Sequence, residues 1–177
     1  MEKNWDVVGV LRHSRHDWLN RLQLIKGNLD LNRVDRAKAI VDQIIIETQN
    51  ESKLSNMKMP LFAALLLTAN WEKHHFHLDY EVLHETETKP VNDSVITKWT
   101  AAFFAVLDRS LDAFQENSLS LCIEQLADGI RFFFDFSGII TETALLKEFL
   151  ELSVEAPVSV RSFSDTELSI EVFMPFR

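Results

Sequence analysis

The 177-residue sequence has little glycine. Its four glycines, at positions 9, 27, 129 and 138, include no Gly-x-Gly pair. A backbone loop that wraps a triphosphate depends on such flexibility, so the sequence lacks a glycine-rich phosphate-binding loop. The single cysteine, Cys122, excludes an internal disulfide, and its alternating apolar surroundings predict a small buried side chain.

Positive charge is also scarce, with 18 Lys and Arg against 27 Asp and Glu and a formal net charge of −9. Nucleic-acid binding needs a basic patch, so we expect no nucleic-acid partner. The longest apolar run, residues 61–67, is too short to span a bilayer, and the first residues do not form a signal peptide. We therefore expect no membrane partner and a cytoplasmic location.

Hydrophobic residues make up 46% of the chain, enough for one medium unit or two small ones. Periodicity predicts helices over residues 5–31, 35–52, 61–74, 92–115 and 141–152, and strands over 78–84, 119–125, 130–136, 158–163 and 168–173. Asp35 is expected to cap the second helix, and Asn92 to Ser94 the long one. The order predicts an α+β fold, with a helical hairpin over 1–56 and an α/β sandwich over 57–177 that has helices on one face of a mixed sheet.

A helical hairpin alone buries too little surface to be stable. Two hairpins from two subunits would complete a four-helix bundle, so we expect a homodimer. The first helix has an apolar stripe that we expect to face a partner helix. This apolar stripe consists of Leu11, Trp18, Leu22, Ile25 and Leu29.

The other side of the first helix contains the candidate site, His16, about 160° from Trp18. The following side chains lie within about 60° of His16 and are called the His16 face below: Arg12, His13, Asn20, Gln23 and Gly27. A lone surface histidine usually has no function. This face, however, lacks the Glu–Lys pairs of a merely solvated helix, and Gly27 costs about 1 kcal/mol relative to Ala. The grouping favours a phosphoryl acceptor within a docking surface.

Neutral imidazole is a competent nucleophile near pH 7. We expect Asp17 to orient the ring and Asn20 to contact the ring or an incoming protein. Arg12 or Arg15 would offset the charge of a phosphoryl group, and Arg21 is expected to add positive charge around His16. No acidic cluster accompanies His16, so we expect no cofactor on this chain and a Mg²⁺ ion that arrives with the partner.

A second group of histidines, His74, His75, His77 and His84, lies around a predicted helix-to-strand junction. Zinc ligation is conceivable for such spacing. No cysteine lies nearby, and a polar junction explains the residues equally well, so we expect no metal.

The element order resembles the catalytic core of a sensor histidine kinase. Such kinases bind ATP with an asparagine in the long helix and with glycine-rich loops. Here Arg109 occupies the asparagine position. Asp135 lies near the position of the adenine-binding aspartate, but Phe136-Ser137-Gly138-Ile139 follows it. The α/β part therefore resembles a histidine-kinase ATP-binding domain without its nucleotide motifs, retained for folding, dimer support or partner contact.

Residues 13–29, HSRHDWLNRLQLIKGNL, and residues 51–56, ESKLSN, resemble the sporulation initiation phosphotransferase family, the B component of the sporulation phosphorelay. The resemblance implies a dimeric histidine phosphotransferase. It would take a phosphoryl group from an aspartyl phosphate on a single-domain response regulator and pass it to an aspartate on a second regulator, a transcription factor. His16 would be the acceptor, because the alternative, His13, lacks the Asp-x-x-Asn that follows His16.

Two other functions remain open. In the first alternative the chain is an ATP-dependent histidine kinase with a divergent nucleotide site. In the second it is a non-catalytic dimeric adaptor that docks response regulators. Autophosphorylation from labelled ATP distinguishes the first alternative, and the effect of His16→Ala on phosphoryl transfer between regulators distinguishes the second.

Overall fold

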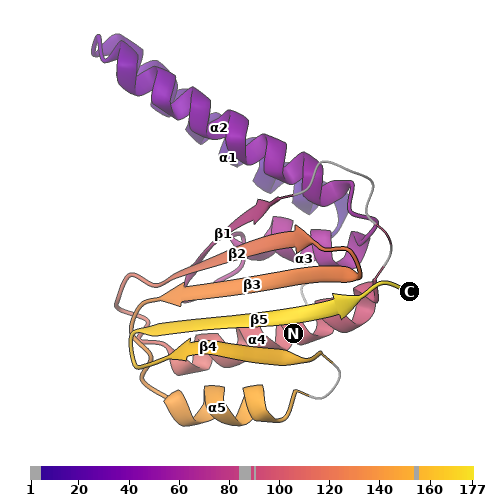
Figure 1. Ribbon diagram of the computed structural model, residues 1–177. Coiled ribbons are helices and arrows are strands. Elements are labelled where there is room, and N and C mark those ends of the chain that lie inside the picture. Colours follow the sequence, from indigo (N-terminus) through magenta and orange to yellow (C-terminus); the bar gives the residue numbers. More distant parts are fainter. Residues whose placement is uncertain (1–4, 84–88, 90, 154–155) are drawn as a thin grey trace. The chain divides into compact units, whose positions relative to one another are not determined.

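The computed structural model describes residues 5–83, 89, 91–153 and 156–177. The helices are α1 (Val7–Asp30), α2 (Val34–Ser55), α3 (Pro60–Ala69), α4 (Asp93–Ser110) and α5 (Thr143–Glu151), and the strands are β1 (His77–Val82), β2 (Ser118–Gln125), β3 (Gly129–Ser137), β4 (Val158–Phe163) and β5 (Glu167–Pro175) (Figure 1). The predicted fold class is confirmed, with a helical N-terminal region followed by an α/β region. Compact units cover Met1–Gln49 and Asn50–Arg177.

Several predicted element ends were wrong. Asp35 does not cap α2, because the helix already begins at Val34 and Asp35 lies in its first turn. The third helix ends at Ala69 rather than at residue 74. Its end is fixed by Asn70, whose side-chain amide exchanges two hydrogen bonds with the backbone of Leu78 at 2.8 and 2.9 Å. The Asn70 side chain bonds to a strand backbone as a neighbouring strand would, and the helix ends at this residue. Hydrophobic periodicity does not predict such a contact.

The long helix α4 begins as predicted, because the side chain of Asn92 accepts a hydrogen bond from the Val95 N–H. It ends at Ser110 rather than at residue 115. Leu111 instead forms an isolated β-bridge with Ile140, so the chain leaves the helix to pair with the segment after β3. Tertiary pairing therefore overrides the helical pattern at this end.

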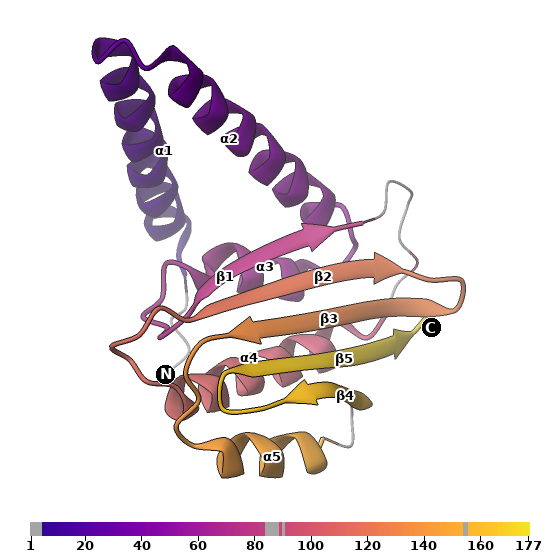
Figure 2. The same ribbon diagram turned by 60° about the vertical axis from the view of Figure 1, so that its left-hand side comes forward.

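The five-stranded sheet has the order β1-β2-β3-β5-β4. β1 runs parallel to β2, whereas the other neighbours are antiparallel, so the sheet is mixed. Figures 1 and 2 show α3, α4 and α5 on one side of it. Phe132 and Phe134 of β3 are fully buried, but Phe133 between them is only half-buried. Burial therefore alternates along β3, because successive side chains of a strand lie on opposite faces.

The last turn of α2 belongs to the α/β unit. Leu54 is fully buried. Asn50 Oδ1 accepts a hydrogen bond from the Val82 N–H at 3.2 Å, and Lys53 Nζ donates to the Val82 carbonyl at 3.3 Å. These side chains satisfy the outer edge of β1 at its end, as the amide of Asn70 does at its start.

The two helices of the hairpin leave its apolar surface uncovered by each other. No described side chain of α1 is buried, and Figure 2 shows α1 and α2 diverging from the turn that joins them. Arg21 and Glu47 form an ion pair of 2.6 Å across the two helices. In the apolar stripe only Ile25 is half-buried, while the other four side chains are 46–56% exposed. The stripe therefore does not pack on α2 of its own chain.

The sheet face opposite the helices is polar and open. Ion pairs join Arg131 to Glu124 and Arg161 to Glu171 on this face. Cys122 lies on the same face and is half-buried, so the prediction of a buried core cysteine was wrong. Burial and then the Glu81 carboxylate raise the pKa of the Cys122 thiol, with a further contribution from Glu124, while Arg131 lowers it.

The raised pKa predicts a slowly reacting cysteine, because the thiolate is the nucleophile. At pH 8 we expect Cys122 of the folded protein to be alkylated by iodoacetamide more slowly than free cysteine, with a rate that keeps rising above pH 9. Glu81→Gln, which removes the carboxylate opposite Cys122 in the parallel register, should speed the reaction. Mass spectrometry of the alkylated chain measures the rate, and the urea-unfolded protein is the control. A folded-state rate equal to that of free cysteine would contradict the prediction.

Candidate functional site

His16 lies midway along α1 and its side chain is 73% exposed. Asn20, one turn on, donates from Nδ2 to His16 Nδ1 at 3.3 Å. The Asp17 Oδ1 atom lies 3.6 Å from the same nitrogen. Both ring contacts made within the described part of the chain therefore fall on Nδ1, and Nε2 is left for an incoming group.

The neighbouring histidine has a different environment. His13 is half-buried, and its Nδ1 lies 3.0 Å from the Gly9 carbonyl oxygen as a donor to it. Its ring packs edge-on against Trp5, with 4.7 Å between the ring centroids. His13 is thus packed where the chain enters the helix, and the exposed ring on this face is His16.

The other residues of the His16 face remain at the surface. Arg12, Gln23 and Gly27 are exposed, as is Arg15, which lies about 100° around the helix from His16. Arg21 is different, because it pairs with Glu47 on the side that faces α2. The expectation that Arg21 adds charge around His16 was therefore wrong, since its carboxylate partner is on another helix and helical spacing does not show it.

Gly27 has no packing reason to be a glycine within the protomer. A Cβ added there would meet no atom within 4 Å, and the residue is exposed in the last turn of α1. Because glycine has no side chain, the His16 face does not protrude at this position, one helical turn beyond Gln23. This geometry suits contact with another protein.

Gly27→Ala should stabilise the protein by about 1 kcal/mol, because Ala is the better helix former and the new methyl group has open space. Urea unfolding at a fixed protein concentration measures the change. Asn28→Ala is unsuitable as a control because its amide bonds to the Leu24 carbonyl, whereas exposed Gln23→Ala is suitable. Destabilisation by Gly27→Ala would instead show that Gly27 packs closely against another chain.

The positions that resemble a kinase nucleotide site have other roles here. Asp135 is exposed on the open sheet face, where the Ser169 hydroxyl donates to its carboxylate. Arg109 is exposed, and its Nε donates to the Ala105 carbonyl within α4 at 3.3 Å.

Aromatic side chains fill the space between α4, α5 and the sheet. The Trp99 ring stacks on Phe103 with 5.4 Å between centroids, and it lies 5.7 Å from Phe149 of α5. Phe103 in turn packs edge-on against Phe134 of β3 at 5.4 Å. Large rings from both helices and the sheet therefore occupy this layer.

The histidines before β1 are fixed by a residue that the sequence analysis missed, Asp108 of α4. Its Oδ2 lies 2.6 Å from His74 Nδ1, and its Oδ1 accepts from the His75 N–H at 2.8 Å. The His75 ring reaches the Asp108 backbone carbonyl at 3.0 Å, whereas His77 lies beside Asp79. No group of three metal-ligating side chains converges within the residues that the structure describes, and His84 lies outside them. No local motif signals Asp108, because it lies 34 positions from His74.

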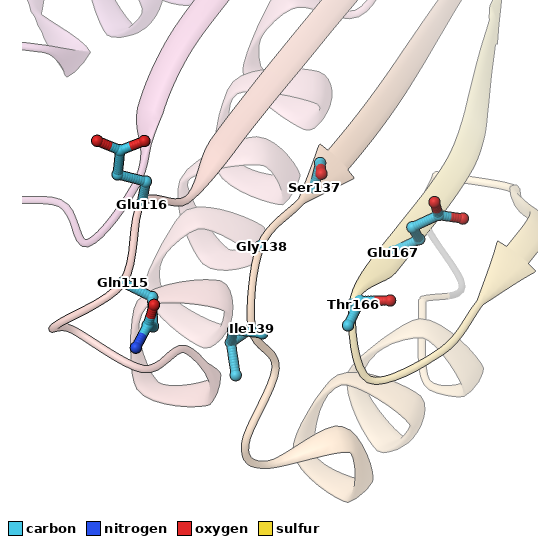
Figure 3. Close-up of a pocket in the computed structure, with 7 residues that line it drawn as sticks. All are labelled: Gln115, Glu116, Ser137, Gly138, Ile139, Thr166 and Glu167. Atoms are coloured by element: carbon cyan, nitrogen blue, oxygen red, sulfur yellow. The ribbon is translucent and has the colours of Figure 1, made fainter.

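Two adjoining hollows lie at the end of the sheet where β2 begins and β3 ends. The smaller, of about 420 Å³, is drawn in Figure 3, with Glu116 and Glu167 on its opposite sides. The larger, of about 680 Å³, extends along the loop before β1. They share three residues, Gln115, Glu116 and Ser137.

Buried Asn117 holds the loops around these hollows together. Its Nδ2 donates to the carbonyls of His75 and Asp112 at 2.8 and 2.9 Å, and its Oδ1 accepts from the Ile139 N–H at 3.0 Å. A Cβ at Gly138 would overlap this oxygen. Gly138 is therefore a packing glycine that admits the Asn117 amide.

Asn117→Ala should destabilise the protein by about 2–4 kcal/mol, because it removes a buried amide that bonds to the backbone of three loops. Gly138→Ala should also destabilise it. The two changes should be less than additive together, since removing the amide makes room for the methyl group. Urea unfolding of both single variants and the double variant measures this, with exposed Gln115→Ala as the control. Full additivity would contradict a direct clash.

Comparison with known proteins follows this division of the chain. The family model described as Sensor_kinase_SpoOB-type, alpha-helical domain, matches residues 1–57, and Sporulation initiation phospho-transferase B, C-terminal, matches residues 58–175. The helical N-terminal region and the five-stranded α/β unit thus match, in order, the two domain models of SpoOB-type proteins. The chain belongs to the sporulation initiation phosphotransferase B family.

A relative is sporulation initiation phosphotransferase B of Bacillus subtilis strain 168, 40% identical over 119 residues. The match covers 67% of this chain and 62% of that protein's length. Among solved structures, the catalytic domain of histidine kinase ThkA is 9% identical, with 72% of this chain and 92% of that chain covered and a TM-score of 0.44. Histidine kinase AdeS of Acinetobacter baumannii is 13% identical, with 92% and 98% covered and a TM-score of 0.42.

Within the described residues, no helix has both the length and the apolar character needed to cross a membrane.

Proposed function

We propose that this chain is a phosphorelay histidine phosphotransferase. It takes a phosphoryl group from the aspartyl phosphate of a single-domain response regulator onto His16 and passes it to an aspartate of a second regulator, a transcription factor that controls sporulation. The observation that supports this most strongly is the exposed His16 ring, contacted on Nδ1 by Asn20 and Asp17 and open at Nε2. Membership of the family supports the reaction class.

In this reaction Nε2 attacks the phosphorus of the aspartyl phosphate in line with the bond to the carboxylate oxygen. The N–P bond forms as the P–O bond breaks, and the regulator's aspartate leaves as a free carboxylate. The second transfer reverses these roles, because an aspartate of the acceptor attacks the phosphohistidine. Arg12, on the His16 face, is the cation that we assign to the phosphoryl charge.

The two neighbours of the ring favour different tautomers. When the Asn20 amide donates a hydrogen bond to Nδ1, the proton of the neutral ring is on Nε2. That nitrogen then has no lone pair with which to attack phosphorus. The attacking tautomer has its proton on Nδ1, and the Asp17 carboxylate 3.6 Å away stabilises it. The Asp17 carboxylate thus favours the tautomer with a nucleophilic Nε2 and stabilises the positive charge that the ring gains, while Asn20 holds the resting ring.

The divalent ion belongs to the partner in this proposal. Within the described residues, Asp17 is the one carboxylate that contacts the His16 ring. Mg²⁺ prefers several oxygen ligands, so we assign it to the regulator's acidic pocket and no cofactor to this chain.

The chain acts as a homodimer in this proposal. The apolar stripe of α1 is exposed although it is large and continuous, and α2 adds exposed Val41 and Ile45. A second hairpin would bury these side chains in a four-helix bundle and leave the His16 face outside.

Incubating the dimeric protein with a phosphorylated single-domain regulator tests the function. We expect acid-labile, base-stable label on the chain, and its complete transfer to a two-domain acceptor regulator. His16→Gln should reduce the labelling rate by at least about a thousandfold, because the nucleophile is removed. His13→Gln is the matched control, being one turn away on the same helix, and should still be labelled.

Two results would overturn the proposal. Labelling from ATP without a regulator would identify a kinase instead. Regulator binding without any label on the wild-type chain would identify an adaptor. Label that persists in His16→Gln and disappears in His13→Gln would move the site.

A further inference from the structure

One large aromatic side chain has no role in the fold. Phe114, in the loop between α4 and β2, is 96% exposed. A phenylalanine in water contributes no burial energy to folding, whereas the same ring in a partner's pocket is a typical interface anchor. The other exposed large apolar side chains of the α/β unit are smaller and less exposed, and the next after Phe114 is Leu152 at 69%.

The loop that holds Phe114 is fixed. The Phe114 N–H donates to Asp112 Oδ1 at 2.9 Å, and the Gln115 N–H to the Asp112 carbonyl at 3.3 Å. Asn117 Nδ2 also donates to that carbonyl, so the turn is tied to the buried amide. An anchor that is already held in place loses little conformational entropy on binding.

The surroundings of Phe114 are acidic. Its neighbours Ala113 and Gln115 line the larger hollow, which also contains Glu72 and Glu116. The smaller hollow contains Glu116 and Glu167, and exposed Ile139 adds apolar surface there (Figure 3). The described residues that line the two hollows include no Lys or Arg. A partner with an apolar pocket edged by Lys or Arg is complementary to this surface.

We infer that this surface, centred on Phe114 with Glu116 beside it, docks the DNA-binding domain of the acceptor regulator. The inference rests on the proposed function, in which the acceptor is a transcription factor and the donor is a single domain. A DNA-binding domain needs a basic face for phosphate contacts, and a single-domain donor has no such domain. The surface therefore strengthens binding of the acceptor alone, because two weak contacts on one chain reinforce each other.

Binding of four purified proteins to the full-length dimer tests this: the donor, the whole acceptor, the isolated receiver domain of the acceptor and its isolated DNA-binding domain. Phe114→Ser and Glu116→Lys should each weaken binding of the whole acceptor and of the DNA-binding domain about tenfold. Binding of the donor and of the isolated receiver should not change. Added salt should weaken the contact, and duplex DNA should compete for the basic face.

Matched controls separate this site from general effects. Leu152→Ser removes another exposed apolar side chain, and Glu148→Lys reverses an exposed charge on α5. Neither should alter binding, and unfolding midpoints should show that all four variants fold. An equal loss with Glu148→Lys, or no binding of the DNA-binding domain, would overturn the inference. A change in the sedimentation coefficient of the Phe114→Ser variant alone would also overturn the inference, because the Phe114 surface would then contact a second copy of this chain. Failure of label to reach His16 from the donor is a separate result, which overturns the proposed function.

Discussion

The first helix of this protein has no buried side chain within the described residues of its own chain. Most helical stability in proteins comes from packing an apolar face rather than from helix propensity. Leu11, Trp18 and Leu22 are each about half exposed, and burial of one such side chain contributes about 1.5–3 kcal/mol. The two helices of the hairpin therefore lack the burial that stabilises most helices, and the proposed four-helix bundle would supply it. The apolar stripe and the exposed ring of His16 lie on opposite sides of α1, so covering the one leaves the other accessible.

The α/β unit meets a different requirement, because its loops and sheet edge leave backbone groups to be satisfied. Asparagine side chains satisfy them in three places. Asn70 pairs with both backbone groups of Leu78, Asn50 accepts from Val82, and Asn117 joins three loops. An amide has both a donor and an acceptor, so it replaces a missing backbone partner without a further strand. A Cβ at position 138 would overlap the Asn117 amide, so the glycine at this position is explained by packing and not by phosphate binding.

The sequence predicted the elements well and their ends less well. The strand over 158–163 was predicted to the residue, and the Asn92 cap was correct, because alternation and capping are local signals. The predicted ends of α3 and α4 were wrong because Asn70 and Leu111 bond to residues outside their own helices, Leu78 and Ile140. The same reason explains the site. Helical spacing placed Asn20 beside His16, but Arg21 pairs with Glu47 of another helix and Asp108 with His74, and no local pattern predicts either contact.

The filled layer between α4 and the sheet shows what the aromatic side chains contribute to the α/β unit. Trp99, Phe103 and Phe134 pack ring against ring there and join the helix to the sheet. Opening such a layer would expose several aromatic side chains, each of which stabilises the fold through burial. In the proposed function the phosphoryl group comes from another protein, and the α/β unit has no part in holding it. The exposed ring of His16 is consistent with that proposal, because an aspartyl phosphate on a partner protein needs a nucleophile on an accessible helix.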